Sequence, residues 1–289
     1  GDVFIMARKE KNGSFAFQIK AEFDKMLSVG ESKFLDKKAD RTQNKIYSWE
    51  TYRTYLKHCN YFTKWAKETH DLKTLEQAKP FINQYLELRE NKGLSAFTLK
   101  LERSALAKLY QIDSKELYQT KSRLRANITR SRGVRVRDKY FSEKNHQDLV
   151  DFCRGTGLRR AELSQIRGNA LKIKNGQYFL EVTKATKGGR PREVEISGNI
   201  KRIVELLEKS GENKVFEKVP NGADIHSYRA EYCKAIYKKY ARPIETLEKK
   251  DIYKCIKDRH ESFDRQAMFI ASKNLGHSRE TVIAGHYLL

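Results

Sequence analysis

Cysteine is scarce in this chain, with four residues among 289. Cys59, Cys153, Cys233 and Cys255 are scattered and form no Cys-x-x-Cys pair. This spacing argues against a zinc site and against a disulfide framework, and it suits a reducing cytoplasm. Three of the four lie in stretches with apolar periodicity, so we expect buried thiols.

Long apolar runs are absent as well. No stretch approaches the roughly 18–20 apolar residues that a membrane-spanning helix needs, and the first residues show no signal-peptide pattern. The chain also lacks an internal repeat, a Walker loop and a Gly-x-Gly-x-x-Gly loop, which argues against nucleotide hydrolysis. We therefore expect a protein that acts without membrane, metal or cofactor.

Acidic residues are few beside the basic ones. The 59 Lys and Arg residues exceed the 37 Asp and Glu residues, which gives a net charge of +22 and a pI near 9.7. Such an excess indicates a polyanionic partner, and DNA fits it better than an anionic membrane does. A chain of this length, 39% hydrophobic, has room for one large or two ordinary domains.

The first part of the chain predicts a helical domain. Residues 1–45 are charged and weakly periodic and are expected to form an N-terminal arm or extension, within which residues 15–27 form either a helix or a short extended arm. Residues 46–120 predict a helical domain with helices starting near Ser48, Pro80 and Ser95. Its basic helices indicate a DNA-binding domain, and an ordinary helical bundle with solvated lysines is the alternative. The first of these helices places Tyr52, Leu56, Cys59, Phe62 and Ala66 on one face.

A basic stretch follows at residues 121–138, and we interpret it as an interdomain linker. No acidic residue occurs between positions 121 and 137. A basic tether between two basic domains indicates a clamp that closes around DNA, and a merely solvated tether is the alternative. The candidate DNA-binding residues of this stretch are Lys121, Arg123, Arg125, Arg130, Arg132, Arg135 and Arg137.

The last part, residues 139–289, predicts an α+β domain with a small antiparallel three-stranded sheet. Asn175-Gly176 between two alternating runs indicates a hairpin of residues 171–174 and 177–184. A third strand is expected at 192–196. The segments before and after are expected to be helical, with Ser142 capping the first helix and Phe263 lying on the face of the last. The predicted protein is thus mainly α, with two domains.

Metal-free cleavage of a DNA phosphodiester requires cations around the phosphate, a nucleophile and an acid for the departing oxygen. Arg159, in GTGLRRAEL (155–163), and Arg229, three residues after His226, are candidate phosphate ligands, because the guanidinium fork matches two phosphate oxygens. Lys187, in a glycine-flanked loop between two strands, is the candidate acid, with Lys184 as competitor.

Two further residues complete the candidate set. His277, in a Leu-Gly-His sequence, is a possible donor to the phosphate, and Tyr287 is the candidate nucleophile. Each of these motifs is weak alone. Ordinary explanations are a surface arginine, a solvated lysine, a packing histidine and a tyrosine that anchors the chain end.

Together the motifs TGLRRAEL, TKGGRPREVEI, HSYR, LGHS and GHYL resemble, in this order, the tyrosine recombinases of the lambda-integrase family. The resemblance implies an N-terminal core-binding domain of the SAM-like type and a C-terminal catalytic domain. It implies these roles: phosphate binding for Arg159 and Arg229, protonation of the 5′ leaving oxygen for Lys187, assistance in proton removal for His226, a third phosphate contact for His277, the covalent 3′ link for Tyr287, and orientation of the site for Glu162.

The resemblance also implies an activity and partners. The expected protein is an integrase or transposase of a mobile genetic element that recombines double-stranded DNA through a 3′-phosphotyrosyl intermediate and a Holliday junction. It would act as a homotetramer on two duplexes, with a dimer on each, in the bacterial cytoplasm at the nucleoid. An accessory DNA-bending or directionality factor is possible. The alternatives are a type IB topoisomerase and a catalytically silent DNA-binding protein of the same fold.

One departure from the family pattern concerns the nucleophile. The usual gap from the Leu-Gly-His histidine to the tyrosine is nine residues, whereas Tyr287 follows His277 by ten, and His286 occupies the expected place. One extra residue would turn an ideal helix by about 100°. We therefore expect the connecting segment to bulge or to end early, which Gly285 would permit.

Overall fold

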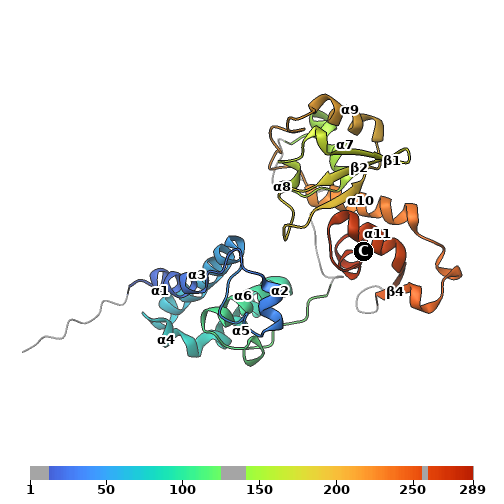
Figure 1. Cartoon of the computed structure of the whole chain (residues 1–289). Helices are drawn as coiled ribbons and strands as arrows, with labels where there is room; N and C mark the ends of the chain where they lie inside the picture. The colour runs from blue at the N-terminus through green and yellow to red at the C-terminus, as the bar shows by residue number, and fades with distance from the viewer. Residues whose placement is uncertain (1–12, 125–140, 256–259, 289) are drawn as a thin grey trace, which may run out of the picture. The chain divides into compact units, whose positions relative to one another are not determined.

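The computed structural model describes residues 13–124, 141–255 and 260–288, and it divides the chain into two compact units. The first unit comprises residues 1–124 and the second residues 125–289 (Figure 1). Each has its own hydrophobic core. No helix in the described residues is long and apolar enough to cross a bilayer. All four cysteines are described, and each is a buried, unpaired thiol, as predicted.

The first unit is a bundle of helices around a core that includes Phe23, Phe62 and Leu106. Ser95 caps its helix as predicted, and Ser48, near which a helix was expected to start, is also a cap, since each side chain accepts a hydrogen bond from a backbone N–H of the first turn. The α-helices are α1 (Phe15–Met26), α2 (Lys33–Lys38), α3 (Trp49–His70), α4 (Leu75–Ala78), α5 (Ile82–Asn91) and α6 (Ala96–Leu109).

The expected N-terminal arm is not separate from this bundle in its described part. Residues 15–26 form helix α1, which packs on α3, and its residues Ile19, Phe23 and Met26 are buried. A short backbone pairing holds the segment after it, because the Ile46 N–H donates to the carbonyl of Met26. Three apolar side chains at helical spacing therefore make residues 15–26 part of the core, and of the two forms expected for residues 15–27 the helix is the one found.

The second unit combines helices with the predicted three-stranded antiparallel sheet. Its strand order is β1 (Leu171–Lys174), β2 (Gln177–Val182) and β3 (Arg192–Glu195). Asn175 and Gly176 both have positive φ, of 50° and 74°, as a two-residue hairpin turn requires. The α-helices are α7 (Gln147–Thr156), α8 (Arg160–Leu163), α9 (Ile200–Ser210), α10 (Ile225–Tyr240), α11 (Arg265–Leu275) and α12 (Thr281–Ile283).

Helix α10 is the centre of this unit. It packs on α7, on α11 and on the last described turn of the chain, Ala284–Leu288, and Figure 1 shows α10 and α11 side by side. Its residue Tyr232 is fully buried and donates to the carbonyl of Glu195 on β3. A helix buried on several sides can bring distant segments together, and the candidate site is built around its first turns.

Two predictions for this unit were wrong. The chain between α10 and α11 is not helical throughout but forms a hairpin of β4 (Ile252–Cys255) and β5 (Glu261–Asp264), and Phe263 lies on β5. The Arg242 guanidinium donates two hydrogen bonds, of 2.7 and 2.9 Å, to the Asp264 carboxylate. This pair joins the start and the end of the segment that contains the hairpin. Helix α7 begins at Gln147 after a 3-10 turn, so Ser142 is not its cap.

Candidate active site

Arg159 stands at the junction of α7 and α8, where the GTGLRRAEL segment turns sharply. Gly157 ends α7 with a φ of 59°, and a Cβ there would overlap the ring of Tyr232. Arg159 comes directly after this turn and precedes α8. Its guanidinium remains one-fifth exposed, so it faces the surface cleft, as the sequence predicted for a phosphate ligand.

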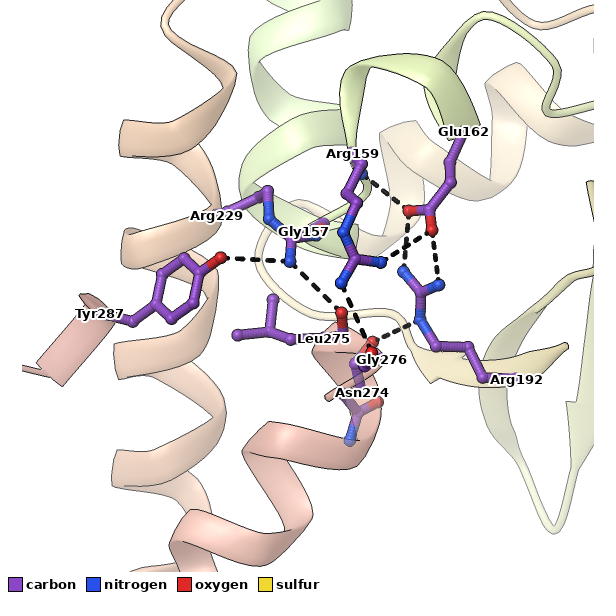
Figure 2. A network of polar contacts seen from close by, with 9 residues as sticks. All are labelled: Gly157, Arg159, Glu162, Arg192, Arg229, Asn274, Leu275, Gly276 and Tyr287. Carbon is purple, nitrogen blue, oxygen red and sulfur yellow. Dashed lines mark hydrogen bonds and ion pairs between the residues drawn. The ribbon is translucent and has the colours of Figure 1, made fainter. Parts of the chain in front are cut away.

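Glu162 holds this arginine in place from a fully buried position. Its carboxylate accepts from the backbone N–H of Arg159 at 2.8 Å and from the Arg159 guanidinium at 3.0 Å. Arg192 adds two parallel hydrogen bonds of 2.7 and 2.8 Å (Figure 2). Burial alone would raise the pKa of Glu162, but the hydrogen bonds and charge of the two arginines outweigh it, and the pKa is lowered.

Arg192 is a residue of this network that the sequence reasoning missed. It opens strand β3, and besides Glu162 it binds the carbonyl of Asn274 near the end of α11 at 2.9 Å. One guanidinium thus joins α8, β3 and α11 (Figure 2). In the sequence, Arg192 is one of several basic residues of the loop and follows Arg190 by two positions. Nothing in that pattern distinguishes a buried, paired arginine from a solvated one.

Arg229 projects from α10 and is almost fully buried. It donates to the carbonyls of Gly157 and Leu275 and, at 3.3 Å, to the hydroxyl of Tyr287. Burial lowers its pKa, and the nearby charge of Arg159 acts in the same direction. An arginine keeps its proton even so. The two candidate phosphate ligands therefore lie close together on separate elements, as Figure 2 shows.

Tyr287 lies in a π-helical turn, Ala284–Leu288, that follows α12. A π turn closes its hydrogen bonds over one more residue than an α turn does. The turn places the buried Tyr287 beside Arg229, whereas His286 is exposed. The expected bulge is therefore present, and the hydroxyl of Tyr287 accepts a hydrogen bond from Arg229.

Three histidine rings surround the phenol. The ring centroids of His226, His277 and His286 lie 5.2, 5.7 and 6.4 Å from that of Tyr287. Burial lowers the pKa of His277 to about 4, with help from the charges of Arg159, Arg229, Lys187 and His286. In this state His277 is neutral at pH 7.

The cleft has two lobes that meet at Arg159. The tyrosine lobe, of about 430 Å³, is lined by Arg159, Arg160, Ala223, Asp224, Ile225, His226, Arg229 and Tyr287. The lysine lobe, of about 310 Å³, is lined by Arg159, Thr186, Lys187, Arg190, Pro191, Arg192, Lys273, Gly276, His277 and Ser278. All six predicted catalytic residues line one lobe or the other. The competitor Lys184 lines a different pocket.

The predicted linker residues fall mostly outside the described chain. Lys121 and Arg123 are described and exposed, and the Arg123 guanidinium lies 5.7 Å from the ring centroid of Phe97. Arg125, Arg130, Arg132, Arg135 and Arg137 lie outside the described residues. Among the residues that the structure describes, no group of three His, Cys, Asp or Glu side chains is placed to hold a metal ion.

Comparison with known proteins identifies the N-terminal unit. Residues 42–116 match the family model of the phage integrase N-terminal SAM-like domain. This match confirms the SAM-like type of domain that the motifs of the other unit had implied. It also supports the resemblance to the tyrosine recombinases, which are enzymes. No curated protein matches the chain.

Two of the solved structures that match the chain are described as follows. The Tn1549 transposon integrase, in complex with circular intermediate DNA, is 13% identical, with a TM-score of 0.44, over 88% of this chain and 94% of that one. The XerH site-specific recombinase, bound to difH substrate, is 16% identical, with a TM-score of 0.48, over 94% of this chain and 91% of that one.

Proposed function

We propose that this chain is a tyrosine site-specific recombinase that cleaves and rejoins DNA through a covalent link to Tyr287. The observation that carries the proposal is the meeting of a buried tyrosine hydroxyl with the buried Arg229, beside Arg159, at the junction of two lobes. The phage integrase domain at residues 42–116 supports the same class independently of this geometry.

In this proposal the two arginines bind the scissile phosphate. Their guanidinium groups come from α10 and from the turn before α8, and both are fixed by hydrogen bonds before any DNA arrives. Preorganised cations stabilise the charge that grows on the phosphate during attack, without rearrangement at that moment. The guanidinium of Arg229 also stabilises the phenolate that forms when Tyr287 attacks.

Proton transfer would be divided between the lobes. His226, in the tyrosine lobe, is placed to assist removal of the phenol proton. Lys187 lies in the lysine lobe, on the other side of Arg159, as an acid for the departing 5′ oxygen requires. His277 would donate a hydrogen bond to a phosphate oxygen from its neutral ring.

The full reaction would be two rounds of transesterification. In the first, Tyr287 takes the place of the 5′ oxygen on phosphorus. In the second, a 5′ hydroxyl from the partner duplex displaces the tyrosine, which leads to a Holliday junction. The bond energy is kept in the protein–DNA ester, so strand exchange needs no nucleotide. A homotetramer on two duplexes, an origin in a mobile element and an accessory factor belong to the same proposal.

Covalent trapping tests the proposal. The parent protein is mixed with a library of nicked duplexes, and SDS-resistant adducts are isolated, sequenced and mapped by mass spectrometry. We expect an adduct at Tyr287 that Tyr287→Phe abolishes and that His286→Ala retains. An adduct at His286 would move the nucleophile by one residue, and DNA binding without any adduct would favour the silent DNA-binding protein.

A second measurement separates the recombinase from the topoisomerase. The trapped DNA site is placed twice on a supercoiled plasmid and incubated with the protein. A recombinase excises or inverts the segment between the sites, in a reaction whose rate depends on both. Relaxation of supercoils without exchange, equally fast with one site, would instead identify a type IB topoisomerase.

A further inference from the structure

The lysine lobe carries more positive charge than one reacting phosphate uses. Five of its lining residues are cations and none is acidic: Arg159, Lys187, Arg190, Arg192 and Lys273. Arg192 is neutralised by Glu162. Among the described residues, Lys187, Arg190 and Lys273 form no ion pair with a carboxylate. Such a concentration of unneutralised cations in a hollow favours an anionic ligand.

The lobe also holds buried polar atoms without hydrogen-bond partners. In the described part of the second unit these are the hydroxyl of Thr186 and Nε2 of His277, and both residues line this lobe. A buried hydroxyl that makes no hydrogen bond destabilises the protein that contains it. His277 belongs to the proposed reaction already, whereas Thr186 has no role in it.

The backbone fixes Thr186 at the edge of the lobe. Its carbonyl accepts from the N–H of Gly189 at 3.1 Å, and Gly188 and Gly189 have φ of 79° and 68°. This turn presents Thr186 and Lys187 to the same cavity. The main chain of the turn is therefore fixed, and the Thr186 hydroxyl, which has no hydrogen-bond partner among the described residues, keeps its donor for another group.

We propose that the lysine lobe is a second phosphate subsite. In it, Thr186, Arg190 and Lys273 bind the backbone phosphate next to the scissile one, on the side of the departing 5′ oxygen. The proposal rests on the proposed function, because the positions of Tyr287 and Lys187 define the two sides. When Tyr287 attacks the scissile phosphate from the tyrosine lobe, the 5′ oxygen departs on the side of Lys187. The next phosphate on that side of the strand therefore lies in the lysine lobe. The Thr186 hydroxyl donates to an oxygen of that phosphate.

The test uses the duplex recovered by covalent trapping, with a neutral methylphosphonate in place of this one phosphate. Single-turnover adduct formation is compared for the parent, Thr186→Val, Thr186→Ser and Arg190→Gln. Thr183→Val is the matched control, because Thr183 is exposed and lines a different pocket. On the native duplex we expect Thr186→Val to be slower by about tenfold, Thr186→Ser to be near the parent, and Thr183→Val to be unchanged.

The methylphosphonate decides whether the interaction is direct. We expect the parent to form the adduct more slowly on the methylphosphonate duplex than on the native duplex. For Thr186→Val and Arg190→Gln we expect little difference between the two duplexes, because these variants already lack the interaction that the methylphosphonate removes. If the effects of substitution and methylphosphonate simply multiply, these residues do not bind this phosphate. A Thr186→Val variant as fast as the parent would also overturn the subsite.

A parent protein that forms no adduct would count against the proposed function, and the subsite then has its own readout. Inorganic phosphate is titrated at constant ionic strength while the thermal midpoint is followed. The subsite predicts that phosphate stabilises the parent and Thr183→Val more than Thr186→Val and Arg190→Gln. An equal rise of the thermal midpoint in all four proteins would contradict the phosphate subsite.

Discussion

At the scale of single residues, the cleft depends on a carboxylate that touches no solvent. Glu162 is fully buried and accepts hydrogen bonds from Arg159 and Arg192. A buried ion pair is costly to break, because removing one partner leaves uncompensated charge in a medium of low polarity. The carboxylate therefore fixes the orientation of Arg159 and contributes to the stability of the second unit.

Glu162→Gln should lower the free energy of unfolding by about 3 kcal/mol, since it leaves two partly buried guanidinium groups short of a counter-charge. Glu205→Gln is the control, because Glu205 pairs with Arg202 at the surface and each side chain is more than two-fifths exposed. There we expect less than about 1 kcal/mol. Urea denaturation followed by circular dichroism measures both, and equal losses of stability would contradict the structural role of Glu162.

The neutral state of His277 predicts a dependence of stability on pH. Its pKa falls from 6.5 to about 4 in the folded protein, mainly through burial. Between these values the unfolded chain binds more protons than the folded one, so the contribution of His277 to stability decreases as the pH falls from 6.5 to 4.

Comparison with His277→Asn isolates this contribution. Between pH 7 and pH 4.5 we expect the parent to lose about 1–2 kcal/mol more stability than the variant does. Denaturation curves at a series of pH values measure the difference. Parallel pH profiles for the two proteins would contradict the lowered pKa.

At the scale of elements, the ends of helices position the site. Gly157 ends α7 before Arg159, and Gly276 ends α11 before His277, both in the left-handed conformation. The π turn does the same for Tyr287, because it takes up one residue beyond an α turn. Three of the candidate residues, Arg159, His277 and Tyr287, thus lie where an α-helix has ended, and they line the cleft.

Gly276→Ala should distinguish the effect of backbone strain on stability from an effect on the geometry of the candidate site. Gly276 has a φ of 75°, and an added Cβ would lie 3.1 Å from the side chain of Arg192. Gly93 is the matched control, with a φ of 79° and open space around it. Both alanine variants should lose about 1–2 kcal/mol of stability. We expect adduct formation to slow only in Gly276→Ala, by about fivefold or more, and equal rates in the two variants would contradict the role of this position.

At the scale of the whole molecule, a net charge of +22 is spread over two units joined by the basic stretch 121–138. Charge of this kind gives DNA affinity that falls with salt, because bound cations release counterions from the duplex. Under the proposed function, both units and the basic stretch 121–138 would bind DNA.

Replacing Arg125, Arg130, Arg132, Arg135 and Arg137 by glutamine tests this arrangement. Removal of each arginine–phosphate interaction should reduce the slope of log affinity against log salt by about 0.9, to a total of about 4.5 for the five residues. The same five positions changed to lysine keep the charge and should keep the slope. Fluorescence anisotropy with a labelled duplex measures it, and an unchanged slope in the glutamine variant would identify the stretch as a solvated tether.

Much of this protein follows from local sequence. Helical periodicity and serine caps place α3 and α6, and Asn175-Gly176 specifies the turn between β1 and β2, because these signals act between residues a few positions apart. The order of the motifs selected all six candidate residues of the cleft. The hydrophobic spacing of Ile19, Phe23 and Met26 is a local signal of the same kind, and it marks the buried face of α1.

The rest was decided by tertiary structure. Nothing local to Arg192 says that it will bind Glu162, thirty positions away. The place of the candidate nucleophile Tyr287 beside Arg229 depends on the π turn that takes up the extra residue, and this turn packs against α10. The segment that contains the β4–β5 hairpin is closed by an ion pair between Arg242, just after α10, and Asp264, the last residue of β5. Sequence patterns record which face of an element is buried, whereas charge pairing and turn geometry depend on partners that only the folded chain brings together.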